Sequence, residues 1–226
     1  MSGLARGGRP TGPVSLSVVD GRVAPVTATY LAPDGDLRCA WSGSVPEFLA
    51  YHDTEWGFPV SDDRRLFEKV SLEGFQSGLS WRTILAKREN FRAAFHGFDF
   101  ERVASFDGSD VERLLQDAGI VRHRGKIEAV VNNARRAVDL VEEKGSIAAY
   151  VWAFEDPEPD RVPEWRATSP TSVAMSRDLK KRGWRFVGPT TAYAFMQAMG
   201  LVNDHETGCV VRERVAKARA AFTPPT

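Results

Sequence analysis

The stretch Leu114-Leu115-Gln116-Asp117-Ala118-Gly119-Ile120-Val121-Arg122-His123-Arg124-Gly125-Lys126-Ile127 decides the fold of this chain. It reads as the end of one helix, a short basic turn bounded by glycines, and the start of a second helix, which together make a helix-hairpin-helix. Glycines let the backbone approach a phosphate, and the first turn of the second helix offers free N–H groups to it. Many helical proteins contain a glycine-bounded turn, so the pattern alone does not establish nucleic-acid binding.

Helical patterns surround this hairpin on both sides. A segment capped by Ser61 or Asp62 carries apolar residues at Leu66, Phe67 and Val70, which is typical of an amphipathic helix. No succession of strands and no internal repeat appears, so we predict an all-α fold. Further helices are expected at residues 80–88, 109–116, 126–143, 172–181, 190–199 and 210–222, of which 190–199 is nearly all apolar and should lie in the core.

The two ends of the chain differ from its middle. Residues 1–36 are rich in Gly, Pro, Ser and Thr and alternate weakly around Asp20-Gly21, which predicts a hairpin in an N-terminal extension. The predicted domain organisation is therefore an extension at 1–36, one helical domain at 37–210, and a basic C-terminal helix or tail at 211–226.

The only two cysteines each lie near a histidine at metal-ligand spacing. The pairs are Cys39-x12-His52 and His205-x3-Cys209. Two thiolates and two imidazoles are the donors of a closed tetrahedral zinc site, and such a site would tie the start of the domain to its end. The alternatives are two unrelated buried thiols or one disulfide.

Composition narrows the classes of protein. With 42% hydrophobic and 27% charged residues the chain is an ordinary globular protein, and no run reaches the about 18 apolar residues of a membrane span. The N-terminus lacks a secretory pattern, so a reducing cytoplasm is expected. The formal net charge is zero. Residues 122–136 and 177–185 are nevertheless locally basic, as a nucleic-acid-binding face or as ordinary solvated helix surface.

A second candidate site lies at residues 72–81, Leu-Glu-Gly-Phe-Gln-Ser-Gly-Leu-Ser-Trp. Glu73 precedes a flexible turn that delivers Trp81, and an acid among aromatics suits a flat, nitrogen-rich ligand. The alternative is a helix-terminal glutamate followed by a core tryptophan. Four more aromatic residues follow Cys39 closely and either extend the pocket or belong to the core; they are Trp41, Phe48, Tyr51 and Trp56.

Five motifs in order give the chain a specific resemblance. They are Cys39-Ala-Trp41, residues 50–57 (Ala-Tyr-His-Asp-x-Glu-Trp-Gly), residues 72–81, residues 117–126 (Asp-Ala-Gly-Ile-Val-Arg-His-Arg-Gly-Lys), and residues 200–209 (Gly-Leu-Val-Asn-Asp-His-x3-Cys). Between Arg38 and Cys209 the chain closely resembles the DNA-3-methyladenine glycosylase I family, a helical branch of the helix-hairpin-helix DNA glycosylase superfamily with a zinc ion that joins both ends of the domain.

The resemblance implies a monofunctional base-excision repair enzyme that flips 3-methyladenine out of double-stranded alkylated DNA and hydrolyses its N-glycosidic bond. No membrane association is implied, and a monomer is expected. Glu73 would be the catalytic residue and would contact the base, with Tyr51 as a second polar contact. Trp81 would stack on the base, and Trp41 and Phe48 would line the pocket, although Phe48 stands where the family pattern has a tyrosine. The implied ligands of one structural zinc are Cys39, His52, His205 and Cys209, and the implied phosphate contacts are Gly119, Arg122, His123, Arg124, Gly125 and Lys126.

The chemistry of the substrate agrees with this reading. A base methylated at N3 is cationic and therefore a good leaving group, so capture in a tight pocket can supply most of the selectivity. We expect Glu73 to read the base and to stabilise its cationic state, with activation of water as the alternative. Lys126 could act as a Schiff-base lyase, but a phosphate contact is the simpler role, and Asp139 matches no motif of the family.

Two rival functions stay open at this stage. One is a non-catalytic, zinc-stapled DNA-binding module on the same scaffold. The other is a glycosylase for a different lesion, such as 3-methylguanine or a 7-methylpurine. Release of free base from methylated duplex DNA separates the first rival from the enzyme, and identification of the released base separates the second.

Overall fold

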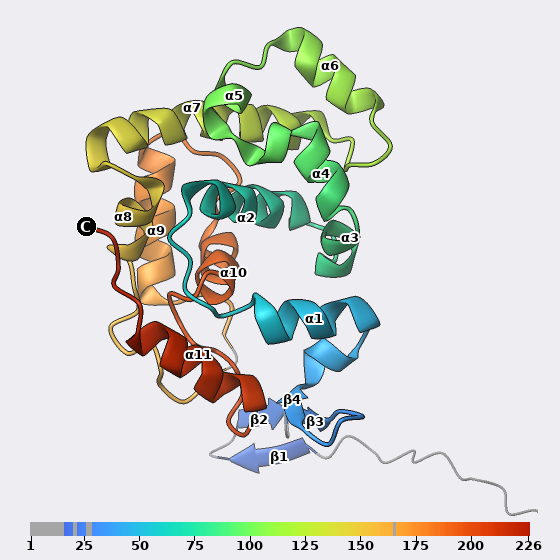
Figure 1. Cartoon of the computed structure of the whole chain (residues 1–226), viewed down its shortest axis with the longest axis vertical. Helices are drawn as coiled ribbons and strands as arrows, with labels where there is room; N and C mark the ends of the chain where they lie inside the picture. Colours follow the sequence, from blue (N-terminus) through green and yellow to red (C-terminus); the bar gives the residue numbers. More distant parts are fainter. Residues whose placement is uncertain (1–15, 20–21, 26–28, 165) are drawn as a thin grey trace, which may run out of the picture.

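The computed structural model describes residues 16–19, 22–25, 29–164 and 166–226, which are mostly helical (Figure 1). The predicted all-α fold is confirmed, with two small antiparallel hairpins near the N-terminus as additions. The strands are β1 (Leu16–Val19), β2 (Arg22–Pro25), β3 (Thr29–Leu31) and β4 (Leu37–Cys39), paired as β1–β2 and β3–β4. The α-helices are α1 (Pro46–Thr54), α2 (Asp63–Gln76), α3 (Trp81–Ala86), α4 (Arg88–Ala94), α5 (Phe100–Ala104), α6 (Gly108–Gln116), α7 (Arg124–Lys144), α8 (Ile147–Trp152), α9 (Pro170–Lys181), α10 (Pro189–Ala198) and α11 (Val210–Ala220).

Side-chain caps start several of these helices where the sequence predicts them. Asp62 accepts a hydrogen bond from the backbone N–H of Arg65 at the start of α2, and Ser80 accepts one from Thr83 at the start of α3. Such caps satisfy N–H groups that have no partner inside the helix. Helix α9 begins at Pro170, two residues before its predicted start, because Ser169 provides the cap.

Helix α2 is the centre of the molecule. Its residues from Leu66 to Phe75 are all buried, and it contacts α7, α8 and α10. Figure 1 shows α2 between α7, which crosses above it, and α10 below it. Phe67 and Phe75 are almost fully buried in the common core. Because α2 is enclosed, the polar side chains on it are held in fixed surroundings.

The two ends of the helical domain meet on one side of α1. Helix α11 contacts β4, and a small apolar cluster of Cys39, Cys209, Val211 and Val215 lies between them (Figure 1). The loop before α11 turns at Gly200, whose φ is +81° and where a Cβ atom would lie 2.6 Å from the backbone carbon of Phe58. Only glycine allows this close approach of two backbones.

The structure shows where the predicted N-terminal hairpin and the two predicted domain boundaries lie. The hairpin around Asp20-Gly21 is present as β1 and β2, although those two residues lie outside the described ones. The predicted boundary after residue 36 separates β3 from its partner β4, and the ring of Tyr30 lies against Gly43. The predicted boundary after residue 210 falls inside α11. Residues 29–36 and α11 therefore pack with the domain.

Among the residues that the structure describes, no helix has the length and apolar character needed to cross a membrane.

Candidate functional site

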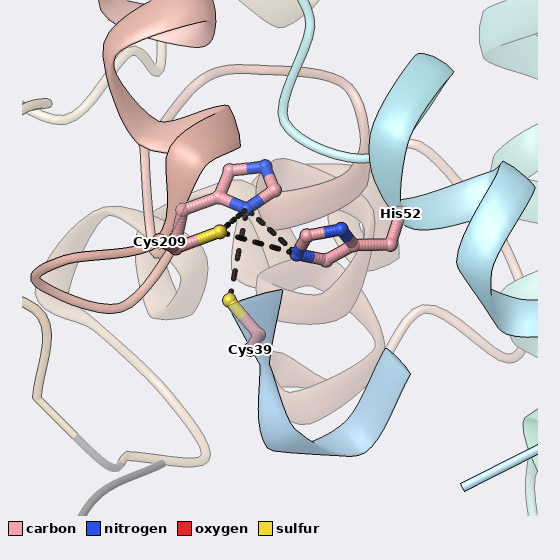
Figure 2. A group of neighbouring side chains, drawn as sticks. Cys39, His52 and Cys209 are labelled. Atoms are coloured by element: carbon pink, nitrogen blue, oxygen red, sulfur yellow. Dashed lines mark hydrogen bonds between the residues drawn. The ribbon is translucent and has the colours of Figure 1, made fainter. Parts of the chain in front are cut away.

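The four predicted metal ligands converge at the junction of the two chain ends. Cys39 ends β4, His52 lies on α1, and His205 and Cys209 lie in the loop before α11. Their donor atoms all lie within 4.8 Å of one another, and all four residues are buried. Figure 2 shows the side chains of Cys39, His52 and Cys209 pointing toward one another. Among the distances between donor atoms are 3.7 Å from Cys39 Sγ to His205 Nδ1 and 3.6 Å from Cys209 Sγ to His52 Nε2. The two imidazole nitrogens, His205 Nδ1 and His52 Nε2, lie 3.1 Å apart.

These separations fit a tetrahedral ion. Zinc bonds of about 2.3 Å to sulfur and about 2.0 Å to nitrogen place neighbouring donors roughly 3.3–3.8 Å apart. The outer nitrogen of each imidazole also has a partner: His52 Nδ1 lies 2.7 Å from Asp53 Oδ1, and His205 Nε2 lies 2.9 Å from the carbonyl of Trp56. Partners of this kind orient a metal-bound histidine and fix its tautomer. The two cysteines are free, so the alternative of a disulfide between them is not what this structure contains.

A separate pocket opens beside this cluster. It has a volume of about 150 Å³, roughly ten times the about 10–15 Å³ that holds one water molecule. It therefore has room for a small planar ring system. Its lining comes from η1 (Ala40–Gly43), α1 and the residues after it, α2, α3 and α10; the lining residues are Trp41, Tyr51, Trp56, Glu73, Gln76, Trp81, Ala194 and Gln197.

Glu73 does not stand alone in this pocket. Lys69, one helical turn earlier on α2, places its ammonium 2.8 Å from Glu73 Oε1 and donates a hydrogen bond of 2.7 Å to the hydroxyl of Tyr51. The same ammonium lies 3.5 Å from the ring centroid of Trp81, within range of a cation–π interaction. Lys69 and Glu73 are each only 6% exposed. An ion pair at such burial is held in one geometry.

Burial also shifts the pKa values of Tyr51 and Lys69. It raises the pKa of Tyr51 well above its ordinary value, and the negative charge of Glu73 adds to that effect. The Tyr51 hydroxyl therefore keeps its proton. Burial lowers the pKa of Lys69, while the charge of Glu73 opposes the change.

The remaining predicted pocket residues are placed less uniformly. Trp41 lines the cavity and makes edge-to-face contacts with Trp56 and Phe48 at 5.2 Å and 5.8 Å between ring centroids. Phe48 supports Trp41 but is not itself part of the lining. Trp81 lines the cavity, and its indole Nε1 is buried without a hydrogen-bond partner among the described residues.

The predicted hairpin is present between α6 and α7. His123 caps α7 by accepting a hydrogen bond from the backbone N–H of Lys126, and Asp117 accepts one from the N–H of Gly119. Lys87, between α3 and α4, donates to the carbonyls of Ala118 and Gly119 and fixes the turn from behind. The turn is therefore a rigid element.

The basic side chains of the hairpin differ in how accessible they are to a phosphate group. Arg122 and His123 are exposed. Arg124 is exposed as well but lies 2.7 Å from Glu112 Oε1. Lys126 is 7% exposed, and its ammonium donates to the carbonyls of Phe75 and Ser77 at 2.9 Å and 2.5 Å. This placement does not favour the phosphate contact expected of Lys126; the side chain instead joins the hairpin to the C-terminal end of α2.

Sequence reasoning missed Lys69, Gln76 and Gln197. A signal existed for Lys69, since it lies four residues before Glu73 on a helix whose other face is apolar. A lysine in that position normally reads as a solvated surface residue, because lysine is almost never fully buried unless paired. Gln197 had a comparable signal as an isolated polar residue in the apolar helix α10.

Fold and site together define the class: a helical protein with a helix-hairpin-helix, a buried Cys₂His₂ cluster, and a pocket that combines an acid with aromatic walls. A family model described as methyladenine glycosylase matches residues 41–213. The chain belongs to the methyladenine glycosylase family.

The relatives cover most of the chain. It is 50% identical over 177 residues to DNA-3-methyladenine glycosylase 1 of Escherichia coli, which spans 76% of this chain and 95% of the relative. A crystal structure of 3-methyladenine DNA glycosylase I is 51% identical, with a TM-score of 0.71 over 76% of this chain and 98% of that one. A structure of the Staphylococcus aureus enzyme, described as giving the structural basis of 3-methyladenine recognition, is 36% identical, with a TM-score of 0.74 over 77% and 96% of the two chains.

Proposed function

We propose that this protein is a base-excision repair DNA glycosylase that removes 3-methyladenine from alkylated DNA by hydrolysing its N-glycosidic bond. The observation that carries the proposal is the pocket, in which Glu73 and Tyr51 lie among the tryptophans Trp41, Trp56 and Trp81. Membership of the methyladenine glycosylase family supports the choice of base.

The pocket residues perform the reaction by capture rather than by strong acid catalysis. The flipped base stacks on Trp81, and the cost of a few kcal/mol for extrusion is offset by that stacking. Glu73 accepts hydrogen bonds from the base and stabilises positive charge on the base and the sugar. Water adds to C1′ as the bond to N9 breaks. The bonding electrons neutralise the departing base, and the proton from water passes to solvent.

The proposed metal is one zinc ion held by Cys39, His52, His205 and Cys209. The two thiolates and two imidazoles, with their 3.6–3.7 Å sulfur-to-nitrogen separations, support zinc over cations that prefer oxygen donors. Four protein ligands leave no position for water, so the ion would act as a cross-link between the chain ends.

The proposed partner is double-stranded DNA, gripped through the hairpin. The backbone around Gly119 and Gly125 and the exposed side chains of Arg122, His123 and Arg124 would contact phosphates. Lys126 acts in this proposal from behind the hairpin, through its bonds to α2. We propose a monomeric, cytoplasmic enzyme whose catalytic residues lie in the domain expected at residues 37–210, with residues 29–36 and α11 packed against it.

A base-release assay tests this function. Purified protein is incubated with methylated duplex DNA, and the released bases are separated by chromatography. The expected product is 3-methyladenine; release of another methylated purine instead, or of no base at all, would contradict the proposal. Glu73→Gln should lower the rate at least about 100-fold, as loss of a group that stabilises transition-state charge does. An unchanged rate in a folded variant would remove Glu73 from the mechanism.

A further inference from the structure

The buried lysine of the pocket is not needed for the function as proposed, yet it contacts every polar or stacking group assigned to the base. Lys69 touches Tyr51, Glu73 and Trp81 within one small volume. It is not part of the cavity lining and therefore acts on the base through these three residues.

The hydrogen bond from Lys69 determines the role of the Tyr51 hydroxyl as a hydrogen-bond donor or acceptor. An ammonium group can only donate, so the tyrosine oxygen is the acceptor in this bond. Among the described residues Lys69 is the one hydrogen-bond partner of that hydroxyl. Because the Lys69 bond occupies the acceptor side of the hydroxyl, Tyr51 can offer its proton as a donor to a molecule in the cavity.

The ion pair with Lys69 gives Glu73 the opposite role, that of a hydrogen-bond acceptor. A carboxylate that is 6% exposed would be costly to keep ionised without a cation beside it. Lys69 supplies that cation at Oε1, and an ionised carboxylate can only accept hydrogen bonds. The second oxygen of Glu73 is then an acceptor for a ligand in the cavity.

We propose that Lys69 is a specificity-determining positioning residue, which presents Tyr51 as a donor and Glu73 as an acceptor and thereby selects 6-aminopurines over 6-oxopurines. The inference rests on the proposed function for the identity of the pocket's ligand. The edge of adenine carries the acceptor N7 beside the donor N6–H₂, whereas guanine carries two acceptors, N7 and O6. A donor–acceptor pair matches the first edge and sets a carboxylate against O6 of the second.

The test uses free bases as probes, so that it does not depend on catalysis. 3-Methyladenine and 3-methylguanine are titrated into the full chain, and quenching of tryptophan fluorescence reports binding beside Trp41, Trp56 and Trp81. The wild-type protein should bind 3-methyladenine at least about tenfold more tightly, the discrimination typical of one well-matched pair of hydrogen bonds.

Lys69→Met removes the charge while it keeps an unbranched apolar stem. Glu73 Oε1 then loses its partner, and the Tyr51 hydroxyl should be free to rotate and to accept as well as donate. The ratio of the two dissociation constants should fall to within about threefold. Lys69→Arg, which keeps the charge, should retain the wild-type direction of preference, and Lys180→Met at an exposed site on α9 should leave the ratio unchanged.

A double variant keeps the test decisive if Lys69→Met does not fold. Lys69→Met with Glu73→Gln leaves no unpaired buried charge and should bind both bases within about threefold of each other. A wild-type protein without preference, or either methionine variant with the wild-type ratio, would overturn the role of Lys69. A failed base-release assay with a Lys69-dependent binding ratio would instead overturn the glycosylase function and leave this inference standing.

Discussion

At the scale of single residues, the chemistry of this protein depends on side chains that their neighbours fix in position, rather than on unusually reactive side chains. Glu73 and Tyr51 are ordinary groups, and their surroundings decide what each can offer to a base. The same holds for the two histidines of the candidate metal site, whose outer nitrogens lie against Asp53 and the Trp56 carbonyl. Preorganisation of this kind suits a reaction whose leaving group is already activated.

One residue-scale prediction concerns Gly200. Its positive φ disfavours any L side chain by about 1–2 kcal/mol, and a Cβ would also lie 2.6 Å from the backbone of Phe58 and Pro59. Gly200→Ala should therefore lower the free energy of unfolding by more than about 2 kcal/mol. The matched control is Gly145→Ala at the end of α7, where φ is +83° and no atom lies within 4 Å. Equal losses in urea unfolding would show that the close approach at Gly200 carries no cost of its own.

At the scale of elements, the hairpin and α2 form one unit. Lys126 on α7 bonds to two carbonyls at the end of α2, the helix that carries Glu73. Lys126→Met should lower stability by about 1–3 kcal/mol, because hydrogen bonds to a charged group are lost. It should leave the salt dependence of DNA affinity unchanged, since the ammonium is buried and bonded to two carbonyls.

Arg122→Gln provides the contrast to that variant. Arg122 is exposed in the same hairpin. Loss of one phosphate contact should reduce the slope of log affinity against log salt by about 1, without a change in stability. Fluorescence anisotropy with duplex DNA over a range of salt concentrations measures both variants. A slope lowered by Lys126→Met as well would restore the phosphate role first expected of that lysine.

A second element-scale prediction concerns pH and the ion pair between Glu143 on α7 and Arg182, the residue that follows α9. Arg182 lies 2.5 Å from Glu143, and its hydrogen bond, together with that of Lys144, holds the pKa of Glu143 at about 2 instead of 4.5. A lowered folded pKa contributes stability above pH 4.5 that is lost as the pH falls toward 2. Arg182→Met should therefore lower the melting temperature at neutral pH, and its difference from wild type should shrink below pH 4.5. Arg177→Met, at an exposed site on α9, should show no such pH-dependent difference.

The starts of many helices could be predicted from the sequence, because the signals that set them are local. Asp62 and Ser80 read as caps because the residue type and the apolar pattern after them act within one turn. Partners across the fold could not be predicted in the same way. Lys126 meets carbonyls 49 and 51 residues away, and Lys69 meets Tyr51 from another helix. Periodicity says which face of a helix is buried but not which element covers it.

At the scale of the whole molecule, the helical domain is closed by contacts between its two ends, β4 and α11. The spacing of the Cys and His pairs indicated this closure because few other arrangements use all four residues. Seven of the described helices followed from the patterns, namely α2, α3, α6, α7, α9, α10 and α11, whereas α1 and α8 did not. The pairing of β3 with β4 across the expected boundary did not follow either, since three-residue strands leave almost no periodic signal. Trp41 packs against the cluster at this junction and Trp56 contacts His205 there, so closure and pocket share one region of the structure.

The last prediction follows from that shared region. Cys39→Ala should abolish the binding of about one zinc ion per chain, as measured by elemental analysis. It should also lower the melting temperature by roughly 10 °C, equivalent to about 3 kcal/mol or more and only a fraction of the free energy of a structural zinc site. Prolonged treatment of the wild type with a chelator should reproduce the shift. Base release should fall as well, because Cys39 is followed closely by Trp41 on the pocket wall.

Val211→Ala is the control that separates the metal from packing. Val211 is fully buried in the same cluster but offers no ligand atom. The variant should lose stability by about 1–2 kcal/mol through the lost methyl groups, while its zinc content stays at one per chain. A Cys39→Ala protein that kept its zinc, or that lost zinc without any fall in melting temperature, would show that the two ends of the chain are held together by apolar contacts alone.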